Sequence, residues 1–281
     1  MNKWIIAGVF LAAGIVQAKQ LDKPDDNTLW MEDGREIEIG KPGFHCWTPG
    51  TGNKALELKP KEDGKGFSFF ARDGAGRKIT TRVKFSPDYR YLVFRITGFE
   101  MSKGYRNWTL RTDLGPMTAS QVNALQKGIF VFDLYQNLPA KEAARKAGSL
   151  NVWCYNLRLD LEYLKMVKKP DYVVRAECAE AEIKPGSKVK FTAELAKEAE
   201  DVSITLMTTG HPHSVNVNGK TKIQLKPTDK TQKIWTAEIE IKSIGIKKAV
   251  KRYGLFMKMD VLGGDLDEPV WVGLPYKILP K

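Results

Sequence analysis

A regular alternation of apolar and other residues constrains the fold of this chain more than any other feature. Within residues 153–163, one set of alternating positions is apolar: Trp153, Tyr155, Leu157, Leu159, Leu161 and Tyr163. The positions between them include Asn156, Arg158, Asp160 and Glu162. A β-strand with one packed face and one solvated face has this period of two. The pattern predicts a long strand whose apolar face, Trp153 included, lies in a core.

Similar runs of β-branched and aromatic residues recur along the chain and predict further strands. In the first half they cover residues 66–71, 78–84, 90–97, 105–111 and 128–134. In the second half they cover residues 188–195, 202–207, 215–217, 222–225, 235–241 and 255–262. Turns are predicted at Asp73-Gly74, at Ser86-Pro87-Asp88 and at Asn218-Gly219. Only residues 139–148, which run from a proline through an Ala/Lys/Glu-rich stretch to a glycine, predict a short helix.

A charged turn with a proline, residues 168–171, divides the chain after its longest predicted strand. We therefore predict an all-β protein of two tandem β-sandwich domains, covering residues 19–171 and 172–281. About seven short strands in the second domain are typical of an immunoglobulin-like sandwich.

Three segments of the second domain carry a resemblance to known proteins. Ile183-Lys-Pro-Gly-Ser-Lys-Val-Lys-Phe191, followed by residues 202–206 and 234–239, resembles the Ig-like accessory domains of bacterial proteins. The first domain, which ends in the long strand, resembles the jelly-roll sandwiches that serve as carbohydrate-binding modules beside secreted glycan-degrading enzymes. The resemblance implies a glycan-binding N-terminal sandwich, but it is one of pattern and transfers no binding residue.

The first eighteen residues have the three parts of a secretory signal peptide. Lys3 gives a positive start, an apolar run extends to Val16, and Val16-Gln17-Ala18 is a small-x-small cleavage pattern. We expect cleavage after Ala18 and a mature protein that is exported, either periplasmic or extracellular. No second long apolar segment follows, so we expect no membrane insertion once the signal is removed.

The protein is basic, with a formal net charge of +12. Because an exported protein rarely meets nucleic acid, an anionic polysaccharide or cell surface is the expected electrostatic partner. The alternative is that the lysines form a solvated surface with no partner. Three cysteines, Cys46, Cys154 and Cys178, permit at most one disulfide, in three pairings, and Cys154 is expected to be a buried free thiol.

Sugar binding needs an exposed aromatic ring beside polar or charged groups, since a pyranose presents an apolar CH face and a rim of hydroxyls. The run Tyr105-Arg106-Asn107-Trp108, with Arg111 on the same predicted strand, combines these residue types. Trp47 is a second such aromatic residue, and it lies beside Thr48 in a segment rich in Gly and Pro. The predicted ligand-binding residues are therefore Trp108, Tyr105, Arg106, Arg111 and Trp47. The alternative for each ring is burial in a core, as for most tryptophans of sandwiches.

Catalytic and metal-binding patterns are weak. The three histidines, among them His211 and His213, lack the spacing of a zinc site. Residues 260–268 hold carboxylates and glycines that calcium could ligate, but an acidic surface turn explains them equally well. No nucleophile lies in an elbow motif of the hydrolase type. We expect no catalytic residue, no metal site and no cofactor.

The sequence therefore predicts a secreted, non-catalytic protein that binds a polysaccharide or a cell-surface glycan through its N-terminal sandwich. Two alternatives stay open. One is a polysaccharide lyase or glycoside hydrolase acting on an acidic glycan, since Tyr105, Arg106, Arg111 and His45 are residue types that such a lyase uses. The other is an envelope structural or assembly protein with a protein partner, because sandwiches can pair through edge strands.

Overall fold

The computed structural model is all-β in the parts of the chain that it describes. These are residues 25–34, 44–47, 56–61, 65–83, 86, 88–101, 107–112, 118–122, 127–134, 148–180, 182–208, 214–249, 255–263, 268–274 and 277–280. Residues 1–18, with the predicted signal peptide, lie outside them, as do residues 139–147 of the predicted helix. No helix in these ranges is long and apolar enough to cross a membrane.

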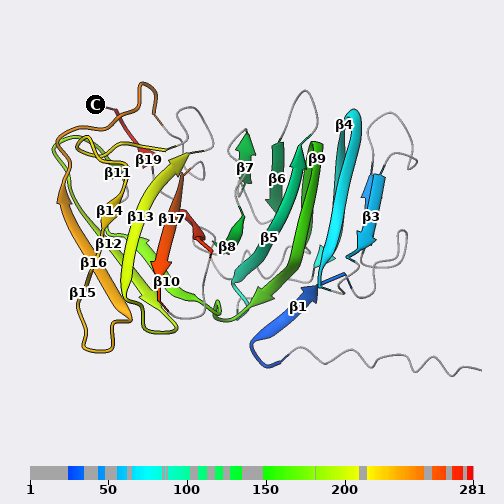
Figure 1. The fold of residues 1–281 in the computed structure, drawn as a ribbon, viewed down its shortest axis with the longest axis horizontal. Helices are drawn as coiled ribbons and strands as arrows, with labels where there is room; N and C mark the ends of the chain where they lie inside the picture. Colours follow the sequence, from blue (N-terminus) through cyan, green and yellow to red (C-terminus); the bar gives the residue numbers. More distant parts are fainter. Residues whose placement is uncertain are drawn as a thin grey trace, which may run out of the picture.

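Nineteen strands are described (Figure 1). The first nine are β1 (Thr28–Glu32), β2 (Phe44–Trp47), β3 (Leu56–Pro60), β4 (Phe67–Val83), β5 (Tyr91–Met101), β6 (Asn107–Thr112), β7 (Thr118–Val122), β8 (Gly128–Asp133) and β9 (Gly148–Val167). The others are β10 (Val173–Cys178), β11 (Glu182–Ile183), β12 (Lys188–Leu195), β13 (Asp201–Thr208), β14 (Ile223–Gln224), β15 (Lys226–Pro227), β16 (Ile234–Glu240), β17 (Leu255–Leu262), β18 (Val270–Leu274) and β19 (Lys277–Ile278).

The N-terminal half is organised around β4 and β9, which pair antiparallel along most of their lengths. Strand β9 changes its other neighbour midway, because residues 157–167 pair with β5 whereas residues 150–155 pair with β6. The prediction of separate strands at 66–71 and 78–84 is wrong, because Asp73-Gly74 lies inside the continuous β4 and not in a turn. The register of β4 against β9 shifts between Ala71 and Gly76.

This half bends back on itself and encloses a core. On the sheet, Trp108 pairs with Cys154 and Phe94 pairs with Leu164, ten residues further along β9. A straight strand would hold those two positions about 33 Å apart. The rings of Phe94 and Trp108 are instead 5.6 Å apart between centroids. The β6–β7 end of the sheet therefore lies over the β5–β8 end, with aromatic side chains between them.

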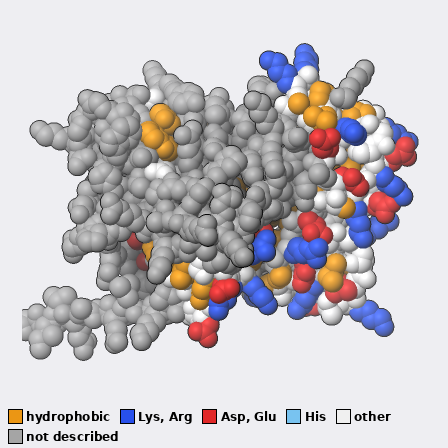
Figure 2. All heavy atoms as spheres, turned by 180° about the vertical axis from the view of Figure 1, so that it is seen from behind, with side chains coloured by type: hydrophobic (Ala, Val, Ile, Leu, Met, Phe, Trp, Pro, Cys, Tyr) orange, Lys and Arg blue, Asp and Glu red, His pale blue; other side chains and the backbone are white. Residues whose placement is uncertain are grey.

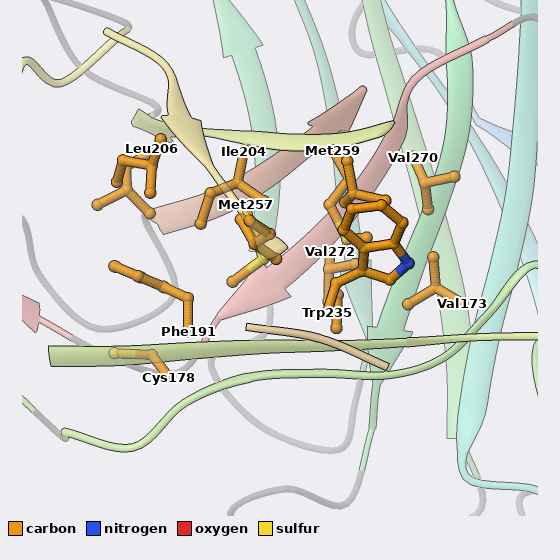
Figure 3. Packing of buried hydrophobic residues seen from close by; sticks show 14 of the residues in the cluster. Val173, Cys178, Phe191, Ile204, Leu206, Trp235, Met257, Met259, Val270 and Val272 are labelled. Carbon is orange, nitrogen blue, oxygen red and sulfur yellow. The ribbon is translucent and has the colours of Figure 1, made fainter. Parts of the chain in front are cut away.

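The C-terminal half is a sandwich of two antiparallel layers. One layer has the order β14-β13-β17-β18 and the other has the order β10-β12-β16-β15. Phe191 and Trp235 of the second layer lie against Ile204, Met257 and Met259 of the first in an apolar core (Figure 3). The turn predicted at Asn218-Gly219 is confirmed, since both residues have positive φ and Val217 and Lys220 bond to each other on either side.

The two halves share one sheet. β18 pairs parallel with β8, so thirteen strands of the described chain form a single sheet that crosses the predicted domain boundary. Side chains of β18 alternate between two cores. Trp271 stacks on Phe130 of the N-terminal core at 5.3 Å, while Val270 and Val272 lie in the C-terminal core. The halves are thus joined by backbone pairing as well as by side-chain packing.

Candidate functional site

A pair of aromatic side chains lies on the outer face of the β6–β9 part of the sheet. Trp153 and Tyr155 of β9 have stacked rings, with an angle of 7° between the ring planes and 6.1 Å between the ring centroids. Both are partly exposed, whereas their neighbours Val152 and Cys154 are buried on the opposite face. Because side chains of a strand alternate between faces, the two rings point away from the core.

The location of this pair corrects the predicted face of β9. Its residues in the N-terminal core are Val152 and Cys154, then Leu157, Leu159 and Leu161, then Leu164 and Met166. The buried positions change from even to odd residue numbers at Asn156, which has a φ of 47°. A residue in this left-handed conformation interrupts the alternation, and Asn tolerates it better than most residues do. The prediction that Trp153 and Tyr155 face the core is therefore wrong, because the irregularity at Asn156 changes which face of β9 is buried.

The strand register brings two of the predicted binding positions to the row of Trp153 and to the row next to it. Trp47 of β2 pairs with Lys78 of β4, which pairs with Trp153. In the next row, Arg111 of β6 pairs with Asn151 of β9. Directly paired residues of antiparallel strands share a face of the sheet. Trp47 and Arg111 thus occupy backbone positions in the rows that contain Trp153 and Asn151, and their side chains lie outside the described part of the structure.

Trp108 does not lie on this surface. Only 1% of it is exposed, and its ring makes edge contacts with Phe94 and Phe130, at interplanar angles of 86° and 87°. The expectation of an exposed ring at Trp108 is therefore wrong, because its position on β6 pairs with the inward-facing Cys154. Tyr105 and Arg106 lie outside the described residues.

A separate, concave site lies at the junction of the two halves. A cleft of about 500 Å³ is lined by Arg90, Tyr91, Asp133, Lys168, Lys169, Arg175, Glu177 and Glu194, together with apolar residues from β8, β10 and β18. Arg90 Nε donates to Asp133 Oδ1 at 3.0 Å, and Arg175 Nε donates to Glu177 Oε2 at 2.9 Å. These hydrogen bonds raise the pKa of both guanidinium groups, so each stays charged.

The described residues contain no cluster of metal ligands. Within the described ranges, no group of three His, Cys, Asp or Glu residues could hold a metal ion. Asp260, from the predicted calcium alternative, instead contacts Lys222 Nζ at 3.0 Å and Lys258 Nζ at 3.3 Å. His211 and His213 lie outside the described residues, as do residues 264–267.

Cys154 and Cys178 are both free and buried, as expected for Cys154. Burial raises the pKa of the Cys178 thiol from 9.0 to about 11, with Glu180 O as its hydrogen-bond acceptor. Below pH 9 this thiol is protonated in folded and unfolded chains alike, so its contribution to stability is intact. Between about pH 9 and 11 only the unfolded chain ionises it, so the free energy of unfolding falls as the pH rises.

We therefore expect the urea midpoint to fall more between pH 8 and pH 10.5 in the wild type than in Cys178→Ala. Comparing the slopes isolates Cys178 from tyrosines such as Tyr91, whose pKa burial also raises. Equal slopes in the two proteins would show that Cys178 does not contribute.

On the face shown in Figure 2, basic and acidic side chains are interspersed over the described surface. This mixture matches the alternative in which much of the positive charge serves as a solvated surface.

Comparison with known proteins identifies no family. No family model matches the chain, and no curated protein sequence matches it. A solved structure of the Endo-D glycoside hydrolase domain from Streptococcus pneumoniae R6 aligns with 82% of this chain at 10% identity and a TM-score of 0.29. This chain covers 36% of that domain's length.

Two other solved structures give similar values. A DUF4785 family protein from Legionella pneumophila aligns with 80% of this chain and 68% of its own length, at 13% identity and a TM-score of 0.26. The adhesin domain of Epf from Streptococcus pyogenes aligns with 87% of this chain and 91% of its own length, at 11% identity and a TM-score of 0.20. At these TM-scores the similarity identifies neither a family nor an activity.

Proposed function

We propose that this protein binds a carbohydrate without transforming it, through the outer face of the β2-β4-β9-β6 part of its sheet. The observation that carries the proposal is the parallel, partly exposed pair Trp153 and Tyr155. The CH face of a pyranose packs against an aromatic ring, and two stacked, partly exposed rings on one strand offer preformed apolar surface. Little side-chain entropy is lost on binding, because each ring already packs on the other.

Polar residues surround this surface in the register. Lys78 and Thr109 flank Trp153 on the neighbouring strands, and Thr80 and Arg111 flank Asn151 in the next row. Amide, hydroxyl and cationic groups can hydrogen-bond the hydroxyl rim of a sugar whose CH face lies on the rings.

The expected effect of removing the rings is a loss of glycan affinity. In Trp153→Ala and in Tyr155→Ala, affinity for the best polysaccharide of a neutral and anionic panel should fall about tenfold or more, which corresponds to about 1.4 kcal/mol. Affinity gel electrophoresis with the purified protein measures this loss. Release of new sugar ends is assayed on the same panel and should not occur.

Ile234→Ala is the control, because Ile234 is 38% exposed on β16, in the other half. It should leave glycan affinity unchanged. Retained affinity in folded Trp153→Ala and Tyr155→Ala would remove this face from the site. New sugar ends would favour the lyase or hydrolase alternative, and no binding to any glycan would favour a protein partner.

A further inference from the structure

The junction cleft has an apolar floor and a charged rim. Val131 of β8, Val173 of β10 and Val272 of β18 line it and are buried, and the half-buried Tyr91 lies beside them. Val131 and Val272 are directly paired across the β8–β18 contact. The floor therefore exists only because the two halves share a sheet. A cleft of about 500 Å³ is within the size range of sites for small molecules.

The rim presents cations more openly than carboxylates. In the Arg90–Asp133 pair the side chains are 45% and 16% exposed, and in the Arg175–Glu177 pair they are 59% and 37% exposed. Lys168 and Lys169 also line the cleft, and Lys168 Nζ lies 5.0 Å from the centroid of the Tyr89 ring. An entering anion would thus meet guanidinium and ammonium groups first.

Three requirements follow for a ligand. It must offer an apolar surface of ring size to the valines and Tyr91, an anion that the exposed cations can bind beside their carboxylate partners, and hydrogen-bond donors to Glu177 and Glu194, of which Glu177 already accepts from Arg175. A neutral sugar lacks the anion. An aromatic acid lacks the hydroxyl donors. A sugar acid has a CH face, a carboxylate and several hydroxyls on one ring.

We propose that the junction cleft binds a single sugar-acid residue of the uronate class. The carboxylate lies toward Arg175 and Lys168, the hydroxyls toward the rim carboxylates, and the ring over Val173 and Tyr91. This site is separate from the aromatic face of β9 and does not depend on it. It also differs in preference, since it selects for charge whereas the aromatic face selects for a CH surface.

Isothermal titration calorimetry of the purified protein with glucuronate and with glucose tests this proposal, since the two sugars differ at one carbon. We expect saturable binding of glucuronate and at least tenfold weaker binding of glucose. The double variant Arg175→Ala, Lys168→Ala should weaken glucuronate binding about tenfold or more, because charge-assisted hydrogen bonds are lost. Added salt should weaken it as well.

Lys190→Ala is the matched control, because Lys190 is an exposed lysine of β12 that does not line the cleft. It should bind glucuronate as the wild type does. Thermal midpoints confirm folding, which the loss of Arg175 and Lys168 should not affect, since both are exposed.

Trp153→Ala separates the two proposals, since it should lose polysaccharide affinity and keep glucuronate affinity. Equal affinity for glucose and glucuronate, no binding of either, or unchanged binding in the double variant would overturn the cleft assignment.

Discussion

Trp108→Ala should lower the free energy of unfolding by about 3–5 kcal/mol, the usual cost of truncating a large buried aromatic side chain. Trp108 is 1% exposed and makes edge contacts with two rings, those of Phe94 and Phe130. It joins the two ends of the bent sheet, so its truncation would leave a cavity between the two layers. Urea denaturation followed by circular dichroism measures the loss.

Trp153→Ala serves as the comparison for this substitution. It removes the same side chain from the strand next to Trp108, but from the partly exposed outer face. Its cost should be smaller by about 2 kcal/mol or more, because less apolar surface leaves a buried environment. For glycan affinity the order should be reversed, with the larger loss in Trp153→Ala. Similar losses of stability in both would contradict the assignment of the two faces.

Gly128→Ala should lower the free energy of unfolding by about 3 kcal/mol or more, because backbone strain and a steric clash add together. Gly128 begins β8 with a φ of +139°. A Cβ atom there would lie 2.4 Å from Pro269 O and 3.0 Å from Trp271 Nε1. The same Pro269 O accepts a hydrogen bond from Ile129 N at 3.1 Å. Relief of the clash would therefore separate β8 from β18 at the start of their pairing.

Gly219→Ala provides a matched glycine control. Gly219 has a φ of +78°, but a Cβ atom at this position would have nothing within 4 Å of it. The substitution should cost only the conformational penalty, about 1–2 kcal/mol. Urea denaturation of both variants gives the comparison, and Gly128→Ala should also broaden the transition as the halves uncouple. Equal costs at the two positions would show that the junction is not tightly packed.

Three strands of the C-terminal half could be predicted closely from the sequence, whereas β10 and β18 were not predicted. Residues 188–195, 202–207 and 255–262 match β12, β13 and β17 to within one residue at either end. β12 follows the turn at Gly186 and has one face in the core and one toward solvent. Under those conditions the period of two and the turn chemistry are sufficient.

Tertiary pairing determined what the local pattern could not. Asp73-Gly74 is a sound turn signal, yet β4 continues through it because β9 provides a partner on both sides. The parallel pairing of β8 with β18 joins residues about 140 positions apart in the chain, and no local periodicity encodes it. A composition-based boundary at residues 168–171 could not reveal a sheet that continues past it.

Prediction of the candidate site was limited for a similar reason. Alternation places Trp108 and Trp153 on definite faces of their strands but does not say which face is buried. The bulge at Asn156 changes which face of β9 is buried. The strand register then places Trp108 inside and Trp153 outside. Ligand binding by Trp47 and Arg111 stays a prediction. Their backbone positions lie in the row of Trp153 and in the row next to it.

The parallel contact between β8 and β18 also has a consequence for how the chain folds. Until residues 270–274 are in place, the edge of β8 has no backbone partner on that side, and its sequence is Gly-Ile-Phe-Val-Phe-Asp. An unpaired, apolar edge strand is a template for association with other chains. Pairings between residues distant in sequence form slowly. Partly folded molecules should thus aggregate through β8, and a chain that ends before β18 should do so persistently.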